Sequence, residues 1–350
     1  MEEEIRSQLK KTIYTLDDWL ARVCLPITDQ RGLFLSFLIH GIFKSEEEAR
    51  SGLLDPQQSI TVDMLRRLIE YFTRIGYKFI STEDLVEGPS QSGKHVLLTF
   101  DDGYYNNLSA LPVLEDFGVP AVFFISSGHV ELSKAFWWDV VHREFKKRGR
   151  TDEEIRLAGA RYKQFRTSEV ESDIRQEFGE SALQPVSDLD RPFTASELRK
   201  FANHRLVFLG NHTKDHAILT NYSGTEISEQ IRDGQDDIRR LTGKTPQIIA
   251  YPNGNYSSEV LEAAKEAGLQ FGLLAQAGRN RLPMESGAVE AMTLKRFTLW
   301  GDRAVEEQCR ASQSGISLYR LLKKNGKEMS HQPSMRLSGK EKVLADPAGS

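Results

Sequence analysis

The sequence predicts an α/β protein built on a parallel sheet or barrel. Short apolar segments of strand length alternate with amphipathic helical segments along most of the chain, and this alternation is typical of β–α–β units with parallel strands. Several strand segments are apolar throughout, as expected when helices cover both faces of a sheet. Polar residues follow three of the strands directly, and in parallel barrels the active site lies at these strand ends.

The N-terminal segment, residues 1–30, is expected to form an amphipathic helix ahead of the main domain. Its apolar stripe would consist of Ile13, Leu16, Trp19 and Leu20. The apolar run LFLSFLIHGIF (33–43) follows. It is too short to span a membrane and about right for a buried strand, so we place the first strand there.

The next part of the chain alternates between helix and strand patterns. Apolar residues recur from Leu65 at i, i+3, i+4 and i+7, which marks one face of a helix. Thr61 or Asp63 can cap the start of this helix, and Gly76 can end it. Strands are then predicted at YKFIS (77–81), VLLTF (96–100) and AVFFIS (121–126), with a helix from about Leu108 to Phe117.

The alternation resumes after residue 193. Helices are predicted at about 195–203, from Ile227 to Leu241, and from Ser257 or Ser258 to Gly268. Strands are predicted at LVFLG (206–210), QIIAY (247–251), FGLL (271–274) and LKRFTLW (294–300). We take residues 31–310 as one domain, interrupted at 129–192 by a long, highly charged helical insertion. Residues 327–350 contain few large apolar side chains and are expected to form a disordered tail.

The composition narrows the class of protein. The 350 residues carry a formal net charge of −4, which argues against a nucleic-acid partner, because proteins that bind nucleic acid usually present a basic face. The two cysteines, Cys24 and Cys309, match no metal or redox spacing. No segment approaches the roughly 18 apolar residues of a membrane span. The N-terminus lacks an apolar leader, so the simplest interpretation is a cytoplasmic protein, although a chain from which a leader had been removed would look the same.

The polar residues after three predicted strands indicate a metal site. They are Asp101 and Asp102 after VLLTF, His212 and His216 after LVFLG, and the turn 251–254 after QIIA. Two histidines four residues apart lie on one face of a helical turn, where both imidazoles reach the same ion. One carboxylate completes an open divalent site, and the second is then available as a general base. The cation would also offset the repulsion between the two acids, but spacing alone does not tell which acid has which role.

Three motifs resemble, in their order along the chain, those of the polysaccharide deacetylase family (carbohydrate esterase family four). They are TFDDGYYNN, GNHTKDH and AYPNG. Four flanking segments are also similar to those of bacterial members: LSFLIHGIF, VDMLRRLIEYFTRIGYKFISTEDL, GVPAVFFI and TASELRKFANHRLVFLGNHT. The resemblance covers about residues 33–128 and 193–300. It implies a distorted (β/α)7 barrel and a metal-dependent hydrolase that removes an acetyl group from an N-acetylated sugar or polysaccharide precursor.

The resemblance also implies roles for individual residues. Asp101 would be the general base, and Asp102 would bind the metal together with His212 and His216. Zinc would be the first choice of metal, with cobalt, nickel, iron or manganese as alternatives. A metal-bound water would attack the acetyl carbonyl, and a backbone N–H of the 252–254 turn would stabilise the oxyanion. The residues expected on the substrate and oxyanion side of the cleft are Tyr104, Tyr251, Pro252, Asn253 and Gly254.

The sequence departs from the family pattern at two places. Ala250 stands where many members carry the arginine that orients the base, although a bacterial subset shares this A-Y-P-x-G form. Arg296 matches an arginine found late in that subset and is expected to contact Asp101 from another strand, the alternative being an exposed ion pair. No histidine occurs between His216 and the C-terminal tail. The proton donor could therefore be solvent, the base returning its proton, or His40, which could equally be a core residue.

Two further questions stay open at the level of sequence. FWWD (136–139) begins the insertion, and its aromatic rings could stack on a sugar or simply anchor the insertion. The function could also be hydrolysis of another C–N bond, such as a formyl amide, ureide or cyclic imide, or non-catalytic sugar binding by a degenerate enzyme. For a cytoplasmic deacetylase, a nucleotide-linked or lipid-linked acetylated sugar is the expected substrate, and the oligomeric state is not predicted.

Overall fold

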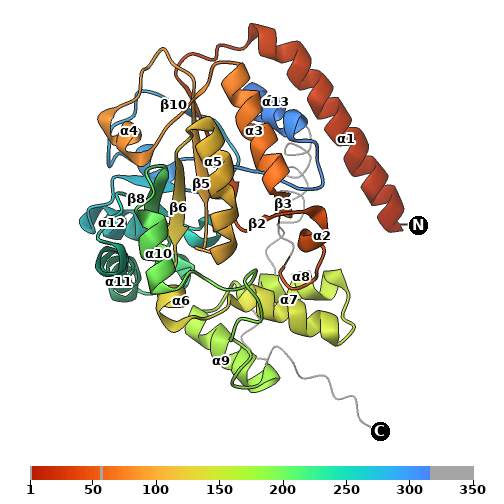
Figure 1. Cartoon of the computed structure of the whole chain (residues 1–350), viewed down its shortest axis with the longest axis vertical. Coiled ribbons are helices and arrows are strands. Elements are labelled where there is room, and N and C mark those ends of the chain that lie inside the picture. The colour runs from red at the N-terminus through yellow and green to blue at the C-terminus, as the bar shows by residue number, and fades with distance from the viewer. Residues whose placement is uncertain (1, 56–57, 316–350) are drawn as a thin grey trace, which may run out of the picture.

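The computed structural model, which describes residues 2–55 and 58–315, is built around one curled sheet (Figure 1). Within these residues the sheet has nine strands in the order β10-β1-β5-β6-β7-β8-β9, with β11 beside β1 and β4 beside β5. The strands are β1 (Leu33–Ile39), β4 (Lys78–Phe79), β5 (His95–Phe100), β6 (Ala121–Ile125), β7 (Val207–Asn211), β8 (Ile248–Ala250), β9 (Phe271–Leu273), β10 (Asn280–Arg281) and β11 (Phe297–Thr298). A separate pair consists of β2 (Ile42–Phe43) and β3 (Ile60–Thr61). In the large sheet, β10 pairs antiparallel with β1 and every other pairing is parallel, as predicted.

Helices surround the sheet, as Figure 1 shows. They are α1 (Glu2–Cys24), α2 (Glu46–Ala49), α3 (Val62–Arg74), α4 (Thr82–Glu87), α5 (Leu111–Phe117), α6 (Ser127–Leu132), α7 (Trp137–Lys147), α8 (Asp152–Tyr162), α9 (Thr167–Phe178), α10 (Ala195–Ala202), α11 (Gly224–Thr242), α12 (Ser258–Glu266) and α13 (Val305–Ser314). Thr61 caps α3 by accepting the Met64 N–H, and Ser257 caps α12 by accepting the Val260 N–H. The parallel sheet and its helices confirm the predicted α/β class.

The sheet is apolar on both faces because both faces are covered. Alternate residues of a strand point to opposite sides. Phe37 of β1 and Phe123 of β6 pack with residues of the surrounding helices, whereas Phe34 and Phe124 belong to a second apolar cluster that fills the interior. All seven residues of β1 and all six of β5 are buried. Because the strands themselves are buried and largely apolar, the polar side chains of this region gather beyond the carboxyl ends of the strands.

The helices α7, α8 and α9 lie together at one end of the sheet (Figure 1). They share an apolar cluster of their own, distinct from those of the sheet. Two buried ion pairs also hold this region, Lys134 with Glu171 at 2.6 Å and Arg143 with Asp190 at 2.8 Å. Buried charges are tolerated when they are paired. This segment can therefore form a compact unit although it is highly charged. The limits of the insertion, 129–192, stay a prediction.

The N-terminal helix packs with a face that differs from the predicted one. Leu16 and Trp19, expected in its buried stripe, are 47% and 59% exposed. The buried side carries Asp18 and Ala21 instead. Asp18 pairs with Arg310 of α13 at 2.5 Å. This ion pair between the two helices orients α1, so the apolar pattern of the helix alone gave the wrong face.

Two predictions concern the membrane and the C-terminus. Among the residues described, no helix is both long and apolar enough to cross a membrane. The predicted disordered tail, residues 327–350, lies outside the described residues.

Candidate metal and active site

The polar residues after three strands meet in one cleft. β5, β7 and β8 run in the same direction, so their carboxyl ends lie at the same edge of the sheet. A cleft of about 630 Å³ opens there, and Asp101, His212 and Tyr251 all line it. Its volume is within the range of small-molecule sites. The fold therefore brings together three segments that are far apart in the sequence.

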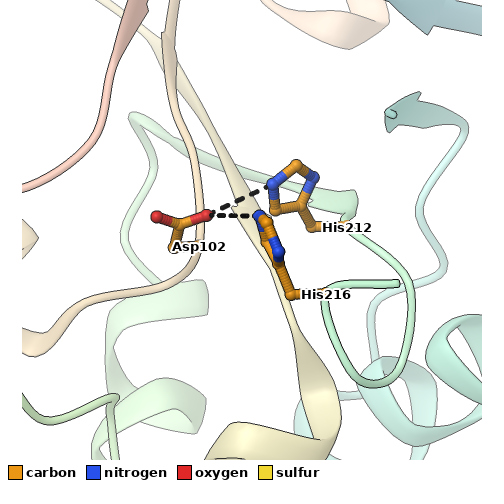
Figure 2. A group of neighbouring side chains, drawn as sticks. All are labelled: Asp102, His212 and His216. Atoms are coloured by element: carbon orange, nitrogen blue, oxygen red, sulfur yellow. Dashed lines mark ion pairs between the residues drawn. The ribbon is translucent and has the colours of Figure 1, made fainter. Parts of the chain in front are cut away.

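Asp102, His212 and His216 form a compact cluster in this cleft (Figure 2). The Asp102 Oδ1 atom lies 3.3 Å from the Nε2 atom of each histidine. Asp102 is fully buried, yet among the described residues neither of its carboxylate oxygens makes a hydrogen bond of normal geometry. A buried carboxylate without donors is costly. Two imidazoles and one carboxylate are the donor set of an open site for a divalent cation, and such an ion would satisfy this carboxylate.

The surroundings of Asp102 keep its side chain ionised. Asp102 and Gly103 have φ angles of +75° and +86°, so the chain turns sharply at the end of β5. Burial by itself raises the pKa of the Asp102 carboxyl, but the neighbouring histidines, His40 foremost, outweigh it. The pKa of Asp102 therefore lies well below its ordinary value, and a carboxylate must be ionised to bind a metal.

The two histidines of the cluster are held in different ways. The Nδ1 atom of His212 lies 2.8 Å from the carbonyl oxygen of Ala250, the last residue of β8. A carbonyl oxygen can only accept, so Nδ1 carries a proton, and in the neutral imidazole the Nε2 atom, on the Asp102 side, would be the one free to bind a metal. The His216 ring instead packs among other rings, with its centroid 4.8 Å from that of His212 and 4.5 Å from that of Trp138.

The histidine pair does not lie on a helical turn, and that prediction is wrong. Residues 212–218 form an irregular loop after β7, in which Thr213 and His216 have φ angles of +62° and +50°. The Asn211 Oδ1 atom accepts the Thr213 N–H at 2.7 Å, and the Thr213 hydroxyl accepts the Ala217 N–H at 2.8 Å. The imidazoles meet because these bonds fold the loop back on itself, and not because of the helical repeat.

The second acid, Asp101, is held by Arg296. The guanidinium donates from Nη1 and Nη2 to the two carboxylate oxygens at 2.7 and 2.8 Å, and it also donates to the Thr99 hydroxyl and the Leu274 carbonyl. Arg296 is 1% exposed, so the alternative of an exposed ion pair is wrong. Burial raises the pKa of Asp101, but Arg296 and His212 lower it below its ordinary value. Asp101 thus stays a carboxylate, 3.9 Å from the Nε2 atom of His212.

Tyr104 does not line this cleft, contrary to the prediction. The turn at Asp102 and Gly103 directs Tyr104 toward the inserted helices, where it is 3% exposed. Its hydroxyl donates to Asp139 at 2.7 Å and accepts the indole N–H of Trp138 at 2.8 Å. Tyr104 borders a separate cavity of about 20 Å³, which has room for roughly one water molecule.

The turn after β8 contributes two of its four predicted residues to the cleft. Tyr251 and Asn253 line the cleft, whereas Pro252 and Gly254 are not among its lining residues. The Tyr251 hydroxyl donates to the Met292 carbonyl at 3.1 Å, so its ring is fixed as part of the wall. Asn253 is exposed to the cleft and has a φ angle of +59°.

The cleft has further wall residues, of which His142 and Trp300 were not singled out from the sequence. Trp137 and Trp138 anchor the insertion, because they are only 5% and 9% exposed, and both also line the cleft. Stacking of these rings on a sugar stays a prediction. His142 follows Trp138 by one turn of α7, and Trp300 follows β11 by two residues; both line the cleft. The strand-end rule that identified the acids would also have identified Trp300. His40 lines the cleft as well, and its buried Nδ1 atom has no hydrogen-bond partner among the described residues.

Known proteins resemble this chain in sequence and in fold. Residues 88–272 match the family model described as Polysaccharide deacetylase. YxkH of Bacillus subtilis (strain 168), named as a member of the polysaccharide deacetylases, is 23% identical over 211 residues, or 58% of this chain and 54% of YxkH. The chain thus spans about half the length of this curated relative.

Two solved structures share the fold. The Streptococcus pyogenes deacetylase PplD in complex with acetate matches with a TM-score of 0.53 at 17% identity, covering 80% of this chain and 98% of PplD. BC0361, a polysaccharide deacetylase from Bacillus cereus, matches with a TM-score of 0.56 at 16% identity, covering 81% of this chain and 69% of BC0361. These likenesses confirm the predicted distorted barrel with its helical insertion.

If the cluster binds a divalent metal, loss of one ligand should release the ion. We expect Asp102→Asn and His212→Ala to lose bound metal, whereas Asp101→Asn should retain it, because Asp101 is held by Arg296 and not by the cluster. Metal content per chain after dialysis against zinc, measured by mass spectrometry, tests this, with circular dichroism as the control for folding. Equal metal content in wild type and both ligand variants would show that the cluster is not a metal site.

Proposed function

The chain belongs to the polysaccharide deacetylase family, and on that premise we propose that it removes the acetyl group of an N-acetylated sugar with the help of a divalent metal. The proposal rests on one observation: a cluster of two histidines and an aspartate shares a cleft with a second carboxylate, Asp101. When bound, a divalent cation acidifies water and polarises an amide carbonyl. Asp102, His212 and His216 would hold this ion, and zinc is the first choice for such a donor set.

Asp101 would act as the general base that takes the proton of the attacking water. A carboxylate has about four lone-pair sites, and Arg296 uses one on each oxygen. The remaining sites can accept a proton, and the two-point contact fixes the plane of the carboxylate. Arg296 would thus supply, from another strand, the guanidinium that many family members carry at the position of Ala250.

A backbone N–H in the turn after β8 would stabilise the oxyanion that forms on the acetyl group. Pro252 has no N–H, and the Gly254 N–H donates to the Tyr251 carbonyl at 2.8 Å. Asn253 remains as the donor within the turn, and it lines the cleft. We therefore assign the oxyanion contact to the Asn253 N–H.

His40 is the best supported of the three routes by which the leaving amine could gain a proton. Its ring lies in the wall of the cleft, with a buried Nδ1 atom that has no partner among the described residues. Two hydrogen bonds engage the His40 backbone: its N–H donates to the Gln58 side chain, and its carbonyl accepts from the Asn107 side chain. The imidazole is therefore available to hold a proton near the reacting group.

The walls of the cleft support a sugar substrate. Trp137, Trp138 and Trp300 all border it, and large aromatic faces offer apolar area with little loss of conformational entropy. The missing usual arginine and the absent late histidine suggest the alternative of a degenerate sugar-binding protein. The buried contact of Arg296 with Asp101 weakens that alternative, because the base has its cationic partner.

The proposed function predicts metal-dependent release of acetate. Zinc-loaded protein should release acetate from N-acetylated oligosaccharides, and Asp101→Asn should lower the rate by about 100-fold or more while metal is retained. The same assay should include an N-formyl sugar, a ureide and a cyclic imide. Turnover confined to those compounds would favour hydrolysis of another C–N bond, and no turnover of any compound would favour the non-catalytic alternative.

Arg296 should affect catalysis more than metal binding. Arg296→Lys keeps the positive charge but loses the two-point contact, so we expect kcat to fall by roughly 10- to 100-fold, as for the loss of one oriented charge-assisted contact. Metal content should stay at the wild-type value. The exposed Arg232, changed to Lys, provides the matched control. A wild-type kcat in Arg296→Lys would show that the base needs no oriented guanidinium.

His40 should matter most where the leaving group needs a proton. We expect His40→Asn to lower turnover of an N-acetylated sugar by about 100-fold, with little effect on 4-nitrophenyl acetate, whose leaving group departs without protonation. Comparison of kcat for the two substrates measures this difference. Equal losses on both substrates would instead indicate a role in binding or folding, and no loss on either would leave solvent or Asp101 as the donor.

A further inference from the structure

We propose that the inserted helices position the metal-site histidine His216, through an anchor network of Trp138, Tyr104 and Asp139. The inference rests on the proposed metal site, and it adds residues that are not ligands. The three residues would act as positioning residues, because none of them belongs to the Asp102, His212 and His216 cluster. The insertion would then be part of the metal centre's support as well as a wall of the cleft.

His216 needs such support more than His212 does. The Nδ1 atom of His212 is fixed by the Ala250 carbonyl at 2.8 Å. Among the described residues, no carbonyl or carboxylate is paired with the Nδ1 atom of His216, and its backbone has a φ angle of +50° in an irregular loop. Its side chain is 13% exposed, against 2% for His212. Metal-binding histidines are usually oriented by a partner beyond the metal, so another group must fix this ring.

Trp138 is the group in contact with the His216 ring. The two ring centroids lie 4.5 Å apart at an interplanar angle of 58°. Trp138 is itself fixed, because its ring stacks on Phe136 at 4.9 Å and its indole N–H donates to the Tyr104 hydroxyl at 2.8 Å. The indole cannot rotate away from His216 without breaking that hydrogen bond.

Tyr104 and Asp139 complete the anchor network. The Tyr104 hydroxyl donates to Asp139 Oδ2 at 2.7 Å, and Asp139 Oδ1 accepts the backbone N–H of Asp55 at 2.9 Å. Tyr104 and Asp139 are 3% and 1% exposed, and a buried network whose members are satisfied is rigid. Tyr104 lies two residues after Asp102. The network therefore starts beside one metal ligand, passes through α7, and ends against another.

The competing explanation is that these contacts merely anchor the insertion to the barrel. A variant of Trp137 can distinguish the two explanations. Trp137 is on the same helix, is 5% exposed, and lines the same cleft. Its ring contacts are with Trp138 and Tyr162, and among the described residues it makes no ring contact with His216. A change at Trp137 should disturb packing in the insertion without reaching the metal.

The test is zinc affinity in three variants. Trp138→Phe keeps a ring beside His216 but removes the N–H, and Tyr104→Phe removes the hydroxyl that joins the network. We expect each to raise the zinc dissociation constant roughly 10-fold or more, as changes beyond the ligand shell commonly do. Trp137→Phe should stay within about twofold of wild type. Competition with a chromophoric chelator gives the constants, and melting temperature identifies variants that are simply unstable.

Two results would overturn the inference. The first is a wild-type zinc constant in both Trp138→Phe and Tyr104→Phe. The second is an equal weakening in Trp137→Phe, which would point to a general effect of insertion packing.

If wild-type protein binds neither zinc nor cobalt, nickel, iron or manganese, the proposed function fails, and the positioning of His216 is then measured directly. Histidine side-chain NMR should show the His216 ring signals shifted in Trp138→Phe and Tyr104→Phe, and unshifted in Trp137→Phe. Unshifted His216 signals in the first two variants would overturn the inference independently of metal.

Discussion

The burial of two adjacent carboxylates at the end of β5 is the constraint on which the rest of the site depends. Asp101 and Asp102 are 3% and 0% exposed, and burial alone raises the pKa of both. Two such charges can stay ionised only if each has its own compensation. The positive φ angles of Asp102 and Gly103 turn the chain there. The two acids accordingly have different partners, Arg296 for Asp101 and the histidine cluster for Asp102.

The partners of the two acids come from separate strands of the sheet. Arg296 precedes β11, which pairs with β1, while His212 follows β7. Ala250 contributes to the surroundings of only one of the two acids. Its small side chain cannot contact Asp101 as an arginine would, but its carbonyl accepts the Nδ1–H of His212. The backbone at this position thus serves the histidine cluster, and the guanidinium beside Asp101 comes from the segment before β11 and also contacts the Leu274 carbonyl after β9.

The inserted helices give the cleft a wall that the barrel alone would not provide. Trp137, Trp138 and His142 line it from α7, and the buried pair of Arg143 with Asp190 holds the same helix in place. In the proposed function, a sugar would lie between these aromatic walls with its acetyl group at the cluster. In the proposed arrangement, the same helix that contacts the sugar also contacts His216, so substrate binding and the metal centre share one rigid support.

The sequence by itself determined the order of strands and helices and the residues that carry charge at the strand ends. These are local properties: a repeat of apolar residues identifies an element, and the polar residue after a strand must lie at the edge of a parallel sheet. The tertiary structure decided which way the side chains face. Trp19 is exposed because Asp18 pairs with Arg310, and Tyr104 points to the insertion because the chain turns at Asp102. Such orientations depend on partners that are distant in sequence, and no local pattern contains them.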